Sequence, residues 1–115
     1  MKAFIKLIIM LFCVTAFSQE QKVDYQQIND ELIKATYYFA DNSSIVEKEG
    51  FFNKEGKLQD SWVSYDLQGN KTAIAYYSNG QKVGVWMYFK KDKINLVTYK
   101  DNKLIAVEEK ALVLN

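Results

Sequence analysis

The sequence predicts an all-β protein, an elongated antiparallel meander of stacked β-hairpins in a single sheet. Three observations lead to this prediction. From about residue 31 on, short runs rich in Val, Ile, Thr and aromatic residues alternate with Gly, Asn and Asp, which is typical of strands joined by tight turns. The chain contains no Pro that would interrupt a strand ladder. It also repeats itself around its two tryptophans, as repeat architectures do.

The expected strands follow in order at residues 31–39, 45–52, 58–66, 71–77, 83–89, 94–99 and 104–107. Asn79-Gly80 is the strongest turn signal between them, because both residue types tolerate positive φ. Upstream, Tyr25, Ile28 and Leu32 fit the stripe of a short helix, yet residues 23–27 fit a first strand equally well, and we favour the strand. Residues 108–115 are expected to be a loose tail or a last strand.

The repeat relates residues 55–66 to residues 79–90 at an offset of 24 positions. At this offset Trp62 aligns with Trp86. A hairpin of this length cannot bury a face alone, so each copy is expected to stack on its neighbours. The spacing shared by the two copies predicts turns at the glycines and a strand at each tryptophan. The repeat-motif residues are Gly56, Trp62, Tyr65, Gly69, Asn79, Gly80, Gly84, Trp86 and Phe89.

The second copy carries the complete pattern N-G-x-x-x-G-x-W-x-x-[YF], from Asn79 to Phe89. This pattern resembles the MORN-repeat variant family of bacteria, often called the YwqK-type antitoxin family. The first copy resembles it with Asp60 in place of the second glycine, and a third copy begins at Tyr99 and stops before any Trp. The resemblance covers about residues 36–107. It implies stacked hairpins in an elongated sheet and, through the family name, neutralisation of a toxin.

Aromatic residues are the main candidates for both core and contact surface. An aromatic ladder of Trp62, Tyr65, Trp86 and Phe89 is expected to form the core, since Trp and Tyr bury much area on a thin sheet. The alternative is a stacking platform for a sugar or a peptide. Adjacent strand residues point to opposite faces, so tyrosines are also expected to remain exposed. The candidates for an exposed binding face are Tyr76, Tyr77, Tyr88 and Tyr99.

Residues 1–18 have the layout of a cleaved signal peptide, with Lys2 and Lys6 before an apolar run at 7–16 and small residues around position 18. The run is too short to span a membrane, which takes about 20 residues. Cys13 lies inside the run after the bulky Phe12, which does not fit a lipoprotein site. We expect an exported protein, periplasmic or secreted, with a lead-in segment at 19–35, the repeat domain at 36–107 and a tail at 108–115.

Composition excludes most catalytic constellations. After residue 18 the chain has no His, Cys or Arg, so Ser-His-Asp and Cys-His sites and the usual zinc ligands cannot form. No glycine-rich phosphate loop is present. Without Lys2 and Lys6 the charges nearly balance, at 13 Lys against 14 carboxylates, which argues against a nucleic-acid partner. Pairs of carboxylates are the remaining route to acid–base chemistry, at Glu47 and Glu49, Asp60 and Asp66, and Glu108 and Glu109.

The sequence therefore predicts a non-enzymatic exported binding or scaffold module without a cofactor or a metal. Its expected partner is a protein or an envelope component. The alternative is an antitoxin or immunity-type protein that neutralises a partner toxin, and a remote alternative is a carboxylate-dependent hydrolase. A membrane surface is a weaker candidate partner, suggested by the MORN name and not by the net charge. The sequence sets neither the ligand nor the oligomeric state.

Overall fold

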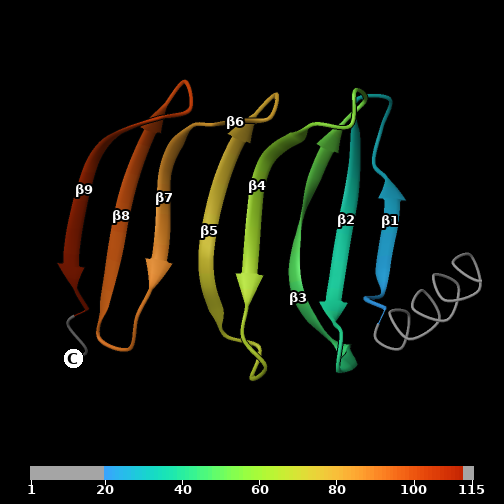
Figure 1. Ribbon diagram of the computed structural model, residues 1–115, viewed down its shortest axis with the longest axis horizontal. Helices are drawn as coiled ribbons and strands as arrows, with labels where there is room; N and C mark the ends of the chain where they lie inside the picture. The colour runs from blue at the N-terminus through green and yellow to red at the C-terminus, as the bar shows by residue number, and fades with distance from the viewer. Residues whose placement is uncertain (1–19, 113–115) are drawn as a thin grey trace, which may run out of the picture.

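The computed structural model describes residues 20–112, which form one open antiparallel sheet in hairpin-meander order (Figure 1). The predicted fold class is confirmed. The hydrogen-bonded order is β1-β2-β3-β4-β5-β7-β8-β9, and the short β6 pairs with β5. The predicted signal peptide at 1–18, Cys13 and the last three residues lie outside the described residues. The strands are β1 Val23–Gln27, β2 Leu32–Phe39, β3 Asn42–Asn53, β4 Leu58–Tyr65, β5 Lys71–Ser78, β6 Gln81–Lys82, β7 Gly84–Phe89, β8 Lys93–Lys100 and β9 Lys103–Ala111.

The two segments left open by the sequence are both strands. Residues 23–27 form β1, which pairs with β2 along its whole length, from Val23 opposite Tyr37 to Gln27 opposite Ile33. At the other end, β9 continues through residues 108–111 and pairs with β8. No helix among residues 20–112 is long and apolar enough to cross a membrane.

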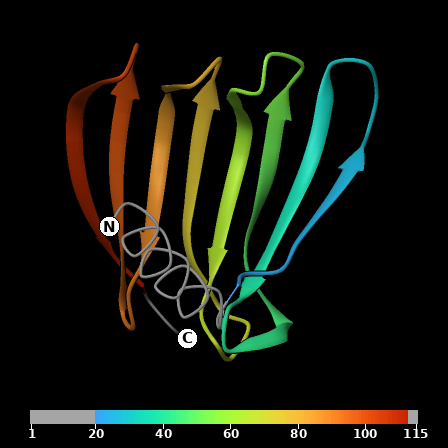
Figure 2. The same cartoon turned by 45° about the vertical axis from the view of Figure 1, so that its right-hand side comes forward.

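The sheet is a single layer, so its core consists of side chains packed on its own surface (Figure 2). We call the surface that carries Trp62 and Trp86 the Trp face. Both tryptophans are buried, at 8% and 7% exposure, and Ala35 is the other buried apolar residue of the described chain. Directly opposed residues of antiparallel strands share a face, so the register fixes which side chains accompany the tryptophans.

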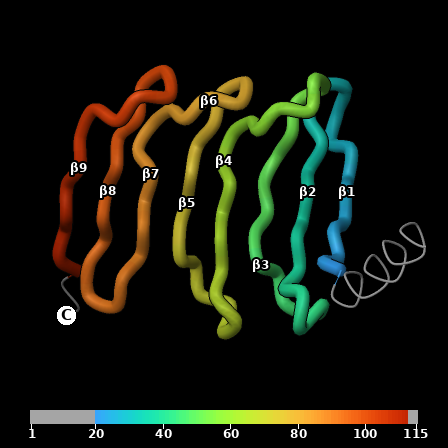
Figure 3. Tube along the Cα trace, in the orientation of Figure 1, coloured from blue at the N-terminus to red at the C-terminus, as the bar shows by residue number. Residues whose placement is uncertain are grey.

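The repeat is visible in the backbone of the turns at one end of the strands, the upper end in Figure 3. The N–H of Gly80 donates to the carbonyl oxygen of Leu58 (2.8 Å), and the N–H of Asn102 donates to that of Lys82 (2.9 Å). The acceptors Leu58 and Lys82 are 24 residues apart, which is the repeat offset, and the donors Gly80 and Asn102 are 22 apart. Asn102 has a φ of 70°, close to the 84° of Gly80. The third copy therefore keeps the turn of the repeat although it has lost the glycine.

The second motif position also keeps its conformation after losing its glycine. Gly84 has a φ of 74°, and Asp60, its counterpart in the first copy, has a φ of 60°. A residue with a Cβ is strained by about 1–2 kcal/mol in this left-handed region. The match shows that the two copies bend their chains in the same way before each tryptophan. Asp is among the non-glycine residue types that tolerate this conformation best.

Candidate functional site

The two indole rings are held by equivalent hydrogen bonds to the backbone. The Nε1–H of Trp62 donates to the carbonyl oxygen of Phe51 (3.0 Å), and that of Trp86 donates to the carbonyl oxygen of Tyr76 (3.0 Å). Each acceptor belongs to the strand that precedes the tryptophan in the sheet. Trp86 makes a further bond to the carbonyl oxygen of Val83 (3.2 Å). With its polar atom satisfied, each ring is fixed against the neighbouring strand.

Each tryptophan is the centre of an aromatic cluster on the Trp face. The ring centroid of Trp62 lies 6.1 Å from that of Tyr37 and 5.1 Å from that of Phe52. These spacings fall within the range in which aromatic pairs attract one another beyond their buried area. The Trp86 cluster is arranged in the same way. The ring centroid of Trp86 lies 5.2 Å from that of Tyr77 and 4.8 Å from that of Tyr99.

Between the clusters lies a hollow of about 320 Å³, which we call the Trp groove. Its floor is made of small side chains, because Ala75 lies opposite Trp62, and Ala73 lies opposite both Ser64 and Tyr88. Aromatic walls over a floor of small residues leave open space on an otherwise filled face. The groove is lined by Tyr37, Lys48, Phe52, Leu58, Trp62, Ser64, Ala73, Ala75, Tyr77, Trp86 and Tyr88.

Lys48 is the only charged residue in this lining. Its Nζ lies 4.8 Å from the ring centroid of Tyr37, within the distance of a cation–π contact. Burial raises the pKa of Tyr77 and Tyr88 above the ordinary value for a phenol, and neighbouring tyrosines raise both pKa values further. Burial also raises the pKa of Tyr37. The phenols are therefore neutral at physiological pH, and the lining carries a single positive charge.

The structure divides the predicted exposed tyrosines between the two faces. Tyr77 and Tyr88 line the Trp groove and Tyr99 packs on Trp86, so these three share the Trp face. Tyr76 is adjacent to Tyr77 on β5 and points to the opposite face. The structure brings three of the four candidates together.

The motif aromatics that follow each tryptophan by three positions also lie on the opposite face. Tyr65 donates its hydroxyl to Glu49 Oε1 (2.8 Å), and Phe89 pairs with Ile94 one position after the groove residue Tyr88. An odd separation along a regular strand reverses the face. In the first cluster Trp62 instead packs on Tyr37 and Phe52. Neither residue belongs to the repeat motif, and their contact with Trp62 follows from the strand register.

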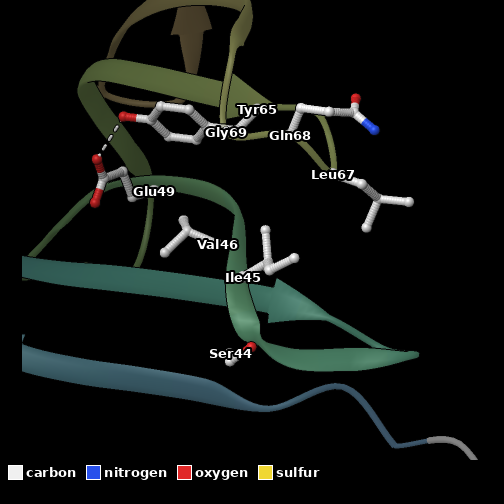
Figure 4. Close-up of a pocket in the computed structure, with 8 residues that line it drawn as sticks. All are labelled: Ser44, Ile45, Val46, Glu49, Tyr65, Leu67, Gln68 and Gly69. Atoms are coloured by element: carbon white, nitrogen blue, oxygen red, sulfur yellow. Dashed lines mark hydrogen bonds between the residues drawn. The ribbon is translucent and has the colours of Figure 1, made fainter.

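A second hollow of about 500 Å³ lies on the opposite face, near the turn between β4 and β5 (Figure 4). Its acid, Glu49, accepts the hydroxyl hydrogen of Tyr65 and lies 3.7 Å from the Nζ of Lys34. Burial, followed by the hydrogen bond to Glu49, raises the pKa of Tyr65. In Figure 4 Leu67 and Gln68 extend away from this pair. The one acid of this hollow is thus engaged by Tyr65 and Lys34, which makes the hollow a weaker candidate than the Trp groove.

Two of the carboxylate pairs that the sequence singled out have a member with an ordinary partner. Glu47 accepts a hydrogen bond from the Nε2 of Gln21 (2.9 Å), and Glu109 lies 3.5 Å from the Nζ of Lys93. Within residues 20–112 no three metal-ligating side chains gather where they could hold an ion. No protein-family model matches this chain, and neither does any curated protein or solved structure.

Proposed function

We propose that this protein is a non-enzymatic, exported binding module that holds a protein or envelope partner on its Trp face. The observation that carries the proposal is the Trp groove, an aromatic hollow with a small-residue floor. Binding energy at interfaces concentrates in well-packed aromatic anchors and the pockets beside them. Tyr and Trp are also enriched at contact surfaces because they combine large area with a polar tip.

Preorganisation supports the proposal further. The indoles of Trp62 and Trp86 are fixed by hydrogen bonds to main-chain carbonyls, so their positions do not depend on a ligand. A ligand that enters a preformed groove loses less free energy to the ordering of the binding site. The single layer leaves this face without a second layer of elements among residues 20–112.

The export part of the proposal rests on the sequence of residues 1–18, and the resemblance to MORN-type repeats supports a scaffold role. The antitoxin alternative would use the same face but would require one dedicated toxin as partner. A hydrolase has less support, because Glu47 and Glu49 are engaged by Gln21, Tyr65 and Lys34.

The test is an affinity capture from the native envelope and medium, with bound proteins and glycans identified by mass spectrometry. Ala73→Leu fills the groove floor, and Ala106→Leu makes the same change at an exposed position opposite Thr98, on the other face. We expect one partner to be retained by the full chain and by Ala106→Leu, and lost with Ala73→Leu. The melting temperature of each variant shows whether it is folded. If Ala73→Leu does not fold, Ser64→Leu fills the same part of the groove and replaces it in the test. Equal retention by all folded variants would refute a role for the groove.

A further inference from the structure

The Trp groove has an apolar end and a polar end. Phe52 and Leu58 oppose each other directly at the apolar end, beside the turn between β3 and β4. Lys48 and Ser64 oppose each other directly at the other end. Lys48 and Phe52 are four residues apart on β3, which corresponds to about 13 Å along a strand. A ligand that fills the groove would therefore place an apolar group at one end and a polar group at the other.

Hydrogen-bond donors dominate the polar end. Ser64 and Tyr88, which each carry a hydroxyl, lie in the same cross-strand row as Lys48, joined through Ala73. Lys48 is the only charged residue of the lining, which contains no carboxylate. A second ammonium, that of Lys82, lies outside this lining, 5.4 Å from the ring centroid of Trp86. A positive charge with neighbouring hydroxyl donors is complementary to an anionic acceptor, and charge-assisted bonds of this kind are the stronger ones.

The size of the groove limits what can fill it. A volume of about 320 Å³ is near the lower end of the range of roughly 300–1,000 Å³ that is usual for ligand pockets. It suits a group of about one residue. An internal Asp or Glu shares its side of an extended chain with an apolar residue two positions away, but such a pair is larger than one residue. Only the last residue of a polypeptide offers an apolar side chain and a main-chain carboxylate together.

We propose that the Trp groove binds the carboxyl-terminal residue of a partner polypeptide, with its aromatic or large aliphatic side chain between the two indoles and its carboxylate at Lys48. Capture of a terminal carboxylate is a recurring mode of peptide recognition. This inference rests on the proposed binding role of the Trp face and specifies the part of the partner that the face recognises.

The test is a titration followed by tryptophan fluorescence, because Trp62 and Trp86 are the only two tryptophans of the chain and both line the groove. The probes are N-acetyl-Gly-Gly-Phe as the free acid, its carboxyl-terminal amide, and N-acetyl-Asp-Gly-Phe-amide, whose internal acid shares a face with the phenylalanine. We expect the free acid to bind the full chain about tenfold more tightly than either amide, which is the scale of one charge-assisted contact.

Lys48→Gln should remove the preference for the free acid, and Lys54→Gln, an exposed lysine in the β3–β4 turn, should keep it. Equal affinity for acid and amide, an unchanged preference in Lys48→Gln, equal binding of the internal acid, or no binding by any probe would each overturn the inference. The affinity capture described above is a separate measurement. A partner that is lost with Ala73→Leu while the peptides fail would leave the proposed function standing and the terminal-residue inference refuted.

Discussion

Gly50 lies directly against the indole of Trp62, and Gly50→Ala should be among the most damaging small substitutions in the chain. A Cβ at this position would lie 2.0 Å from Trp62 Cδ2 and 2.3 Å from Cε2. Ordinary contact begins at 3.4 Å, so the ring would have to move by about 1.4 Å. Gly50 has no positive φ, so the predicted effect is purely steric.

The magnitude follows from what the ring would lose. Displacement would lengthen the 3.0 Å bond from Trp62 Nε1 to the carbonyl oxygen of Phe51, which costs about 1 kcal/mol for a typical hydrogen bond. Overpacking adds about 1–3 kcal/mol. We therefore expect Gly50→Ala to lower the free energy of unfolding by about 2–4 kcal/mol, a large share of the roughly 5–15 kcal/mol that stabilises most domains.

The assay is urea unfolding followed by tryptophan fluorescence. Gly69→Ala is the matched control, because an added Cβ there meets nothing within 4 Å and the cost comes only from its φ of 84°. That cost should be about 1 kcal/mol. If Gly50→Ala costs no more than Gly69→Ala, the close packing of Trp62 on β3 is refuted.

Three further predictions concern the repeat, its turns and its tyrosines. Asp60→Gly should raise the free energy of unfolding by up to about 1 kcal/mol because it relieves a φ of 60° that Asp tolerates only in part. Gly84→Ala should lower it by about 1–2 kcal/mol, and equal signs in the two urea titrations would contradict the account. The pKa values of Tyr77 and Tyr88 are raised in the folded state, so their contribution to stability should be fully present below about pH 10 and fall as the pH rises further. A melting temperature that stays constant to pH 12 would contradict this. Asn53→Ala should cost about 1–2 kcal/mol, since its side chain accepts from two backbone N–H groups of its own turn and donates to the next turn; a loss under about 0.3 kcal/mol on urea unfolding would refute that role.

The strands and turns could be predicted because their signals are local. Alternation of apolar residues marks a strand, and Asn79-Gly80 adopts the positive φ values, 52° and 84°, that its residue types favour. The loss of glycine at Asp60 did not change the backbone. Asp tolerates the left-handed region better than most residues with a Cβ, so the drifted copy can keep the conformation of the glycine copy.

The composition of the aromatic clusters depends on register, which the sequence does not show. Tyr37 reaches Trp62 from β2, although β3 lies between their strands. One available signal was Gly50, since a glycine inside a strand often marks a close approach. The number of residues between two strand positions was another signal: Tyr65 lies three positions from Trp62, and an odd separation places it on the other face. The groove itself arises from alanines spaced two apart, Ala73 and Ala75, a pattern that is evident only once the aromatic walls are placed.

The central claim, that the Trp face binds the partner, is tested most directly by photo-crosslinking from two adjacent positions. Tyr88 lines the Trp groove, and Phe89 is the next residue of β7 on the opposite face. p-Benzoylphenylalanine replaces an aromatic ring at either position, and the full chain is irradiated in its native envelope. The account predicts a discrete adduct from position 88 and none from position 89. An adduct from position 89 alone, or from neither position in a folded protein, would contradict it.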